Sequence, residues 1–276
     1  MKYGISTIVL AQTELQAALR RIAEAGFDQI EIVAEPPHFG PGDYPPKQVR
    51  AWLDEFGLKA PVAHGIYSYD KPDCSSPDEA RRRASVENIT RCFEPLAALG
   101  VQYVVLHPTG NYSPEAYTPD TRPARIRQAR KSIEELAERA GPMRLRLAWE
   151  NLPNYGGPRP LNSMADLRPL IEDLPAHVGL CVDTTHAKIA GHNPAEQMRI
   201  AGNRLFCLHL HDCDGKRDCH WVPGKGIIDW PAVLQALDEI KFRGPRTIEV
   251  ISTDEDSDAV LADAHRVARE WEQGRR

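Results

Sequence analysis

The sequence predicts an α/β fold, a single (β/α)8 TIM barrel over residues 1–276 with its active site at the C-terminal ends of the strands. The length of 276 residues is usual for one such barrel. Short apolar runs alternate with longer helical patterns, which is the order that a parallel barrel requires. Polar residues stand at the ends of most apolar runs, where this fold carries its chemistry.

Each expected element is supported by its own pattern. In the first helix, Thr13 is the expected N-cap, Leu15, Leu19 and Ile22 form the apolar stripe, and Gly26 is the stop. The sequence Ser76-Pro77 opens a long third helix. The expected strands cover residues 3–9, 29–33, 59–65, 102–107, 144–150, 178–183, 205–211 and 247–251. The expected helices cover residues 13–25, 47–56, 76–99, 122–140, 163–174 and 257–271, and a further helix begins near Trp230.

The seventh strand and the loop after it are rich in metal-binding residue types. Side chains alternate faces along a strand, so His209 and His211 share one face and Phe206 lies on the other. Asp218 and His220 follow in the loop, before a Pro-Gly-x-Gly turn at residues 223–226. Histidine and aspartate both ligate divalent ions. Taken alone, this stretch fits a metal site and a polar surface loop equally well.

The ends of the other strands favour the metal site. A lone histidine or glutamate at a strand end is usually part of the core or the rim. Here, however, a histidine or a carboxylate ends one strand after another: His64, His107, Glu150, Asp183, His209 and Glu249. Carboxylates that converge on one barrel mouth repel each other and lose solvation. A divalent cation removes that repulsion, so the pattern predicts a metal centre.

The chain resembles the xylose-isomerase-like TIM-barrel superfamily, which includes sugar phosphate isomerases, ketose epimerases and AP endonuclease family 2. The resemblance covers nearly the whole chain and rests on Glu150-Asn151, Asp183-x-x-His186, His209-x-x-Asp212, the Pro-Gly-x-Gly turn and Glu249. It implies one divalent ion (Mn, Co, Mg or Zn) held by Glu150, Asp183, His209 and Glu249. It also implies that Glu150 and Glu249 are the catalytic acid/base pair of an isomerase or epimerase. The substrate would be a sugar, sugar phosphate or cyclitol, and the reaction would pass through a metal-stabilised enediolate.

Two alternatives stay open. The endonuclease-four branch uses nine ligands for two or three zinc ions, and the chain has a counterpart of each, adding His64, His107, His186, Asp218 and His220 to the four above. The net charge of −5 and the acidic, proline-rich loop over residues 35–46 argue against nucleic acid as a partner. The third reading is a non-catalytic metal-binding or sugar-binding barrel.

Five residues are expected to contact the substrate or shape its pocket. His186 does so by the resemblance, and Glu31 is a feature of the sugar-enzyme branch. Trp221 would wall the pocket, and His211 would wall it or orient a ligand. Lys225 follows the seventh strand, where this fold often binds phosphate, although a single lysine is equally well a surface charge.

The composition sets the remaining expectations. No run of about eighteen apolar residues predicts a membrane span, and the N-terminus lacks a signal-peptide pattern. The six cysteines form no CxxC pair and are expected to be reduced thiols in a cytoplasmic protein, with Cys213 and Cys219 as the one ambiguous pair. The resemblance, not the composition, implies a small carbohydrate as the partner, and homo-oligomer formation stays open.

Overall fold

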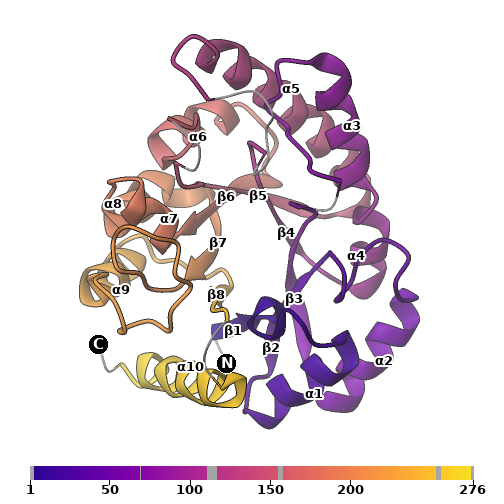
Figure 1. The fold of residues 1–276 in the computed structure, drawn as a ribbon, viewed down its shortest axis with the longest axis vertical. Coiled ribbons are helices and arrows are strands. Elements are labelled where there is room, and N and C mark those ends of the chain that lie inside the picture. Colours follow the sequence, from indigo (N-terminus) through magenta and orange to yellow (C-terminus); the bar gives the residue numbers. More distant parts are fainter. Residues whose placement is uncertain (1–2, 69, 111–116, 155–157, 253–255, 275–276) are drawn as a thin grey trace.

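Eight parallel strands close into a barrel with the helices outside it (Figure 1). The computed structural model describes residues 3–68, 70–110, 117–154, 158–252 and 256–274. The strands pair in chain order and β8 returns to β1, which confirms the predicted fold class. The strands are β1 (Tyr3–Ser6), β2 (Gln29–Val33), β3 (Lys59–His64), β4 (Tyr103–Leu106), β5 (Arg146–Glu150), β6 (Val178–Asp183), β7 (Leu205–Leu210) and β8 (Arg246–Ile248).

The helices connect successive strands and cover the barrel. The α-helices are α1 (Leu15–Glu24), α2 (Pro46–Phe56), α3 (Glu79–Thr90), α4 (Phe93–Leu99), α5 (Arg122–Ala140), α6 (Met164–Ile171), α7 (Thr184–Ile189), α8 (Pro194–Ala201), α9 (Trp230–Glu239) and α10 (Ser257–Glu272). Short 3-10 helices are η1 (Thr7–Leu10), η2 (Gly141–Met143) and η3 (Gly202–Arg204).

The N-terminal strand is shorter than predicted. It ends at Ser6, whose side chain accepts a hydrogen bond from the Ile8 backbone and starts η1. The Thr7 hydroxyl accepts a hydrogen bond from the Val33 backbone, so the chain turns over the end of β2. The predicted N-cap Thr13 is also wrong, because its own N–H closes a turn on Leu10 and α1 begins two residues later.

The long third helix is in fact two helices, α3 and α4. Asp78, not Ser76, caps α3 and accepts hydrogen bonds from the backbone of Ala80 and Arg81. The break falls at residues 91–92, four residues before Pro95. A proline inside a helix has no N–H to donate, and its ring clashes with the carbonyl four residues earlier. A continuous helix over 76–99 is therefore not possible without a kink.

Two helices between β6 and β7 were missed by the sequence analysis. The helix α7 begins directly after Asp183, whose side chain caps it. The helix α8 begins with Pro194, and the Asn193 side chain accepts hydrogen bonds from the first turn. An Asn-Pro pair is a helix-start signal that was available in the sequence.

The barrel interior below the site is filled by apolar side chains and thiols. A cluster inside the barrel consists of Val62, Val105, Ala148, Cys181, Phe206 and Cys207. The prediction that Phe206 lies on the opposite face of β7 from His209 is wrong. The pairing of β6 with β7 contains a bulge, because Leu180 pairs with Leu205 and Cys181 with Cys207. A bulge inserts one extra residue and re-aims a side chain. Trp149 packs on the outer side against the helices, as its alternation predicts.

His38 holds the loop after β2 in place, and its burial lowers the stability of the folded state at acidic pH. Its ring is buried and bonds to the Thr7 hydroxyl at 3.0 Å and to the Leu10 carbonyl at 3.2 Å. Burial lowers the pKa of His38, because the charged imidazolium would lose its water. The stability that this neutral ring contributes is therefore present above the unfolded-state pKa and is lost as the pH falls below it.

We expect His38→Gln to flatten the fall of the melting temperature with pH between about 6.5 and 5. Glutamine can also donate and accept hydrogen bonds, but it cannot titrate. The matched control is His192→Gln on the connection between α7 and α8, where the ring is half-buried. Thermal denaturation over a pH series measures the effect, and equal slopes for wild type and His38→Gln would contradict it.

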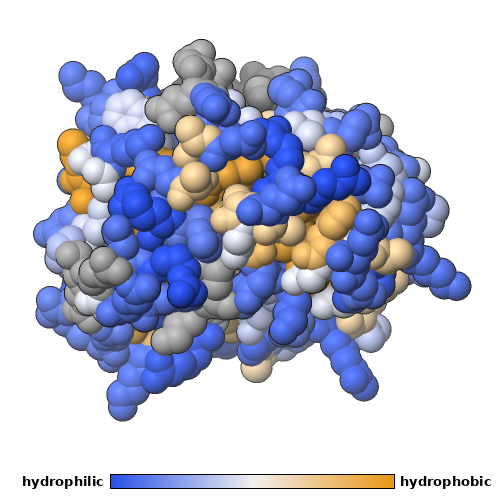
Figure 2. Space-filling model, turned by 90° about the horizontal axis from the view of Figure 1, so that it is seen from below, coloured by the Kyte–Doolittle hydropathy of each residue, from blue (hydrophilic) through white to orange (hydrophobic). Residues whose placement is uncertain are grey.

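The molecular surface is mainly polar. Figure 2 shows that hydrophilic side chains cover most of the face seen from below, with apolar side chains between them. Among the described residues, the large hydrophobic side chains with substantial exposure are Trp221 (36%) and Ile227 (53%). In the part of the chain that the structure describes, no helix is both long and apolar enough to cross a membrane.

Candidate metal centre

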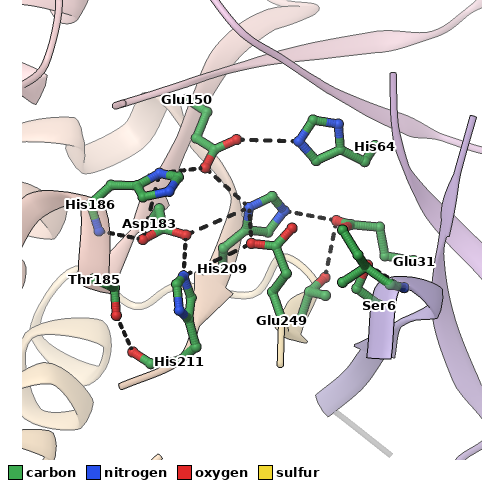
Figure 3. Close-up of polar contacts among 12 residues, drawn as sticks. Ser6, Glu31, His64, Glu150, Asp183, Thr185, His186, His209, His211 and Glu249 are labelled. Atoms are coloured by element: carbon green, nitrogen blue, oxygen red, sulfur yellow. Dashed lines mark hydrogen bonds and ion pairs between the residues drawn. The ribbon is translucent and has the colours of Figure 1, made fainter. Parts of the chain in front are cut away.

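Four side chains from four consecutive strands meet at the C-terminal end of the barrel (Figure 3). Glu150 ends β5, Asp183 ends β6, His209 lies in β7, and Glu249 follows β8. One ligand atom from each lies within 4.8 Å of those of the other three, and all four residues are buried. Two oxygens, from Glu150 and Glu249, each lie 3.3 Å from Nδ1 of His209. This is the set that the sequence analysis assigned to one divalent ion.

Local structure fixes two of these side chains. Asp183 caps α7 by accepting a hydrogen bond from the His186 backbone at 2.7 Å with Oδ1, which leaves Oδ2 to face the cluster. The Asn151 side chain accepts a hydrogen bond from the Asp183 N–H and donates one to its carbonyl. The ends of β5 and β6 are therefore held together directly beside Glu150.

A second group of possible ligands lies next to the first and consists of His186, His211, Asp218 and His220. Oδ2 of Asp218 is 3.1 Å from Nε2 of His186 and 3.3 Å from Nε2 of His220. The Nδ1 atoms of the same two rings face the carbonyl oxygens of Asn151 and Glu249 at 3.0 and 2.9 Å. Because a carbonyl can only accept, both Nδ1 atoms carry a proton. Each Nε2 faces the Asp218 carboxylate, so a second ring proton or a metal ion must lie between them.

A third group lies on the other side of Glu150. The rings of His64 and His107 approach the second oxygen of Glu150 with their Nε2 atoms at 3.5 and 3.3 Å. Nδ1 of His64 faces the Gly65 carbonyl at 2.9 Å, so its Nε2 lone pair is also free toward the carboxylate. Tyr67 packs edge-on against His64, with ring centroids 4.7 Å apart.

The buried carboxylates at the C-terminal end of the barrel favour positive charge beside them. Burial opposes ionisation of Glu150, but the surrounding histidines, His209 foremost, hold its pKa well below its usual range. Burial likewise opposes charge on His220, yet Asp218 outweighs it and raises the pKa of His220 to about 9. Burial raises the pKa of Glu249.

The donor set fits a metal ion. Carboxylate oxygens and imidazole nitrogens are ordinary ligands of Mn, Co and Zn. His209 Nδ1 and one oxygen of Glu150 make no hydrogen bond among the described residues although both are buried. Nitrogen lone pairs that face carboxylates are stable only with a cation or a proton between them. The four-residue cluster can therefore hold a divalent ion, and the His186/Asp218/His220 group can hold a second.

The loop that carries Asp218 and His220 is held by one buried carboxylate, Asp212. Its two oxygens accept hydrogen bonds from the backbone of Cys213, Gly224 and Ile228 and from the Trp230 indole, at 2.8 to 3.1 Å. The second glycine of the Pro-Gly-x-Gly turn is needed for this arrangement, because a Cβ on Gly226 would lie 2.3 Å from an Asp212 oxygen. Gly224 supplies a positive φ of 91°.

We expect Asp212→Asn to destabilise the protein by about 2 to 5 kcal/mol, since an amide replaces one acceptor oxygen and leaves two buried donors without a partner. Urea denaturation measures this loss. Asp229→Asn, at the exposed N-cap of α9, is the control and should cost about 1 kcal/mol or less. A loss for Asp212→Asn no larger than the control would contradict the role given to Asp212.

A pocket of about 190 Å³ opens onto these groups. The sequence-predicted residues in its lining are His64, His107, Glu150, His186, Asp218, His220 and Glu249. The other lining residues are Tyr67 and four that sequence reasoning gave no site role: Ile8, Leu152, Pro153 and Ile251. Position was a usable signal for the last three, because they lie two or three residues beyond Glu150 and Glu249.

Four of the five residues expected at the substrate do not line this pocket. Glu31 and His211 are fully buried behind the ligands, and His211 bonds instead to Oδ2 of Asp183 at 2.7 Å. Lys225 pairs with Asp263 of α10 at 3.3 Å. Trp221 forms a backbone bridge to Asp212 and its ring is partly exposed. His186 has the expected position, and the bond of His211 to Asp183 fits the expectation that it orients a ligand. The geometry does not support substrate contact by Glu31, Trp221 and Lys225.

The cysteines are free thiols in the structure, including the ambiguous Cys213 and Cys219.

Known proteins share both this fold and this sequence pattern. The chain is 29% identical over 261 residues to a D-psicose 3-epimerase of Enterocloster bolteae, covering 90% of this chain and 82% of the relative. A probable endonuclease 4 of Nitratidesulfovibrio vulgaris is 32% identical over 187 residues, which cover 60% of this chain and 62% of the relative. A solved D-tagatose 3-epimerase-like protein superposes with a TM-score of 0.85 at 27% identity, covering 100% of this chain and 98% of that one.

The family model described as xylose isomerase-like TIM barrel matches residues 19–271, which include all the ligands discussed above. Sugar epimerases are prominent among the sequence and structural neighbours. The closed barrel and the grouping of carboxylates and histidines at its C-terminal end agree with that match. The chain therefore belongs to the xylose isomerase-like TIM barrel family.

Proposed function

We propose that this protein is a divalent-metal-dependent epimerase or isomerase of a ketose or a related small sugar. The observation that carries the proposal is the cluster of Glu150, Asp183, His209 and Glu249, whose ligand atoms lie within 4.8 Å of one another. The likeness to 3-epimerases of D-psicose and D-tagatose supports a ketose as the substrate. Thiols that are all free suit a reducing compartment, so we place the activity in the cytoplasm.

The two glutamates are arranged for proton transfer. Glu150 comes from β5 and Glu249 follows β8, so they reach the pocket from different sides of the barrel, and both line it. Epimerisation requires that a proton leave one face of a carbon and return to the other, which two carboxylates on different sides can do. A divalent ion bound by the cluster would polarise the substrate carbonyl and make the neighbouring C–H more acidic.

Other residues of the chain orient and enclose the substrate. Asp218 lines the pocket between His186 and His220, and one of its oxygens has no hydrogen-bond partner among the described residues, so it can accept a hydrogen bond from a sugar hydroxyl. Ile8, Tyr67, Leu152 and Ile251 add apolar surface to the same pocket. At about 190 Å³ the cavity is smaller than the usual 300 to 1,000 Å³ of sites for drug-sized ligands, which fits a monosaccharide.

Solvent exchange tests the proposal. The metal-loaded protein is incubated in D2O with a panel of ketoses, including D-psicose, D-tagatose and D-fructose, and proton NMR follows the carbon next to the carbonyl. We expect deuterium to enter that position together with the epimeric product. The panel also includes sugar phosphates and inososes, and no exchange with any of these compounds would contradict the proposal.

The second candidate function is hydrolysis of a phosphodiester at an abasic site. The specific observation in its favour is the set of two further ligand groups around Asp218 and around His64 and His107, which allow more than one ion. The partial match to an endonuclease 4 points the same way. The net charge of −5 argues against it, because tracking of nucleic acid phosphates needs many basic side chains. Cleavage of an abasic-site oligonucleotide in the absence of ketose exchange would favour this candidate.

A further inference from the structure

Glu31 is a carboxylate at the centre of the barrel that no substrate can reach. It lies in β2, is 0% exposed, and does not line the pocket. Its Oε2 is 2.9 Å from Nε2 of His209, and the Thr247 hydroxyl is 3.4 Å from the same oxygen. Figure 3 shows Glu31 on the side of His209 opposite to Glu150. The contact joins residues that are 178 positions apart in the chain.

The contact with Glu31 involves the opposite ring nitrogen of His209 from the one through which the neighbouring histidines bond to fixed groups. Nδ1 of His64, His186 and His220 faces a backbone carbonyl at 2.9 to 3.0 Å, so these rings carry a proton on Nδ1 and offer Nε2. In His209 the arrangement is reversed. Its Nε2 faces a carboxylate, while its Nδ1 is 3.3 Å from Glu150 and 3.3 Å from Glu249.

We propose that Glu31 is a positioning residue that holds the proton of His209 on Nε2 and thereby makes Nδ1 a metal ligand. This inference rests on the proposed function, since it needs a metal ion in the cluster of Glu150, Asp183, His209 and Glu249. Histidines that bind metals almost always donate their other N–H to a carboxylate or a carbonyl, which fixes the ring and makes the ligand nitrogen more basic. Glu31 is the carboxylate in that position.

A purely structural role would not explain this choice of residue. One oxygen of Glu31 has no hydrogen-bond partner among the described residues, although it is buried. Burying a carboxylate whose oxygens do not all have a hydrogen-bond partner costs free energy. Below this level the barrel interior is lined mainly by aliphatic side chains and thiols. Packing of the core alone therefore does not account for a glutamate at position 31.

The metal affinity and the stability of two Glu31 variants and one control variant test the inference. The variants are Glu31→Leu, which removes the acceptor, and Glu31→Gln, whose amide oxygen can still accept the Nε2 proton without charge. The control is Asp73→Asn, which removes another buried carboxylate, 3.1 Å from Arg125 and outside the site. Chelator competition with Co²⁺ gives the affinity, the Co²⁺ absorption spectrum reports the ligand geometry, and ¹⁵N NMR of the protein loaded with diamagnetic Zn²⁺ reports which nitrogen of His209 carries the proton.

We expect Glu31→Leu to bind Co²⁺ about 10- to 100-fold more weakly than wild type, with a changed absorption spectrum and loss of the Nε2–H signal of His209. The Co²⁺ affinity of Glu31→Gln should lie between those of wild type and Glu31→Leu. Metal-free Glu31→Leu should melt earlier than wild type, because the Nε2–H of His209 loses its acceptor in the core. Asp73→Asn should also melt earlier, but it should keep the wild-type Co²⁺ affinity and spectrum, so the Co²⁺ measurements separate the role of Glu31 from a loss of stability.

The failures of the two proposals can be told apart. If wild type binds Co²⁺ at the cluster and Glu31→Leu binds it with the same affinity and spectrum, the role of Glu31 is wrong and the proposed function stands. The role is also wrong if His209 carries its proton on Nδ1 in the wild type. If wild type binds no Co²⁺ at the cluster, the proposed function and the role of Glu31 are both wrong.

Discussion

Glu249→Gln is expected to lower kcat/KM toward the best ketose substrate by about 10³-fold. Glutamine keeps the shape of the side chain, but it cannot take a proton and is a weaker metal ligand. Glu249 faces both the pocket and Nδ1 of His209 at 3.3 Å, so a single substitution affects proton transfer and metal binding together. The effect should therefore appear in kcat rather than in KM alone.

Steady-state kinetics at saturating metal measures this effect. Glu239→Gln is a suitable control, because Glu239 lies at the end of α9 and pairs with Arg199 on the surface. It should stay within about twofold of wild type, as surface changes of this kind usually have little effect. Activity of Glu249→Gln within tenfold of wild type would mean that Glu249 is not part of the catalytic pair.

Removal of metal is expected to lower the melting temperature by about 10 °C. Glu31, Glu150, Asp183, Asp218 and Glu249 crowd one end of the barrel, and without a cation their charges must be offset by protonation of the histidines between them. A ligand at about 1,000 times its dissociation constant stabilises the folded state by about 4 kcal/mol. For a chain of this size each kcal/mol shifts the melting temperature by roughly 2 to 4 °C.

Calorimetry before and after chelation measures this shift, and added Mn²⁺ or Co²⁺ should restore the original value. The restoration should depend on metal concentration, as mass action requires. A variant with both Glu150→Gln and Glu249→Gln serves as control, since its melting temperature should respond little to chelation. Equal melting temperatures of wild type with and without metal would contradict a bound ion.

The strand ends were predictable because the fold imposes them. Once eight parallel strands are assigned, the C-terminal residues of each must meet, so Glu150, Asp183 and Glu249 could be placed together without knowing any distance. Alternation along a strand put His209 inside the barrel. These inferences need only local pattern and one rule of topology.

Loop positions were not predictable by the same means. Lys225 and Trp221 lie after the last strand-like residue of β7, where no periodicity applies, and the hydrogen bonds of Asp212 decide where the loop folds. The face of β7 on which Phe206 lies depends on a bulge in the pairing with β6. The sequence of β7 alone does not reveal that bulge. The contact between Glu31 and His209 crosses the barrel, so it depends on register between distant strands.

The most direct test of the account is the metal content and metal position in protein purified without chelator or added metal. Elemental analysis gives the number of ions per chain, and anomalous diffraction gives their positions. We predict at least one divalent ion between Glu150, Asp183, His209 and Glu249, lost in the double variant of the two glutamates. A protein that contains no divalent ion there, and takes up none on titration with Mn²⁺, Co²⁺ or Zn²⁺, would contradict the account.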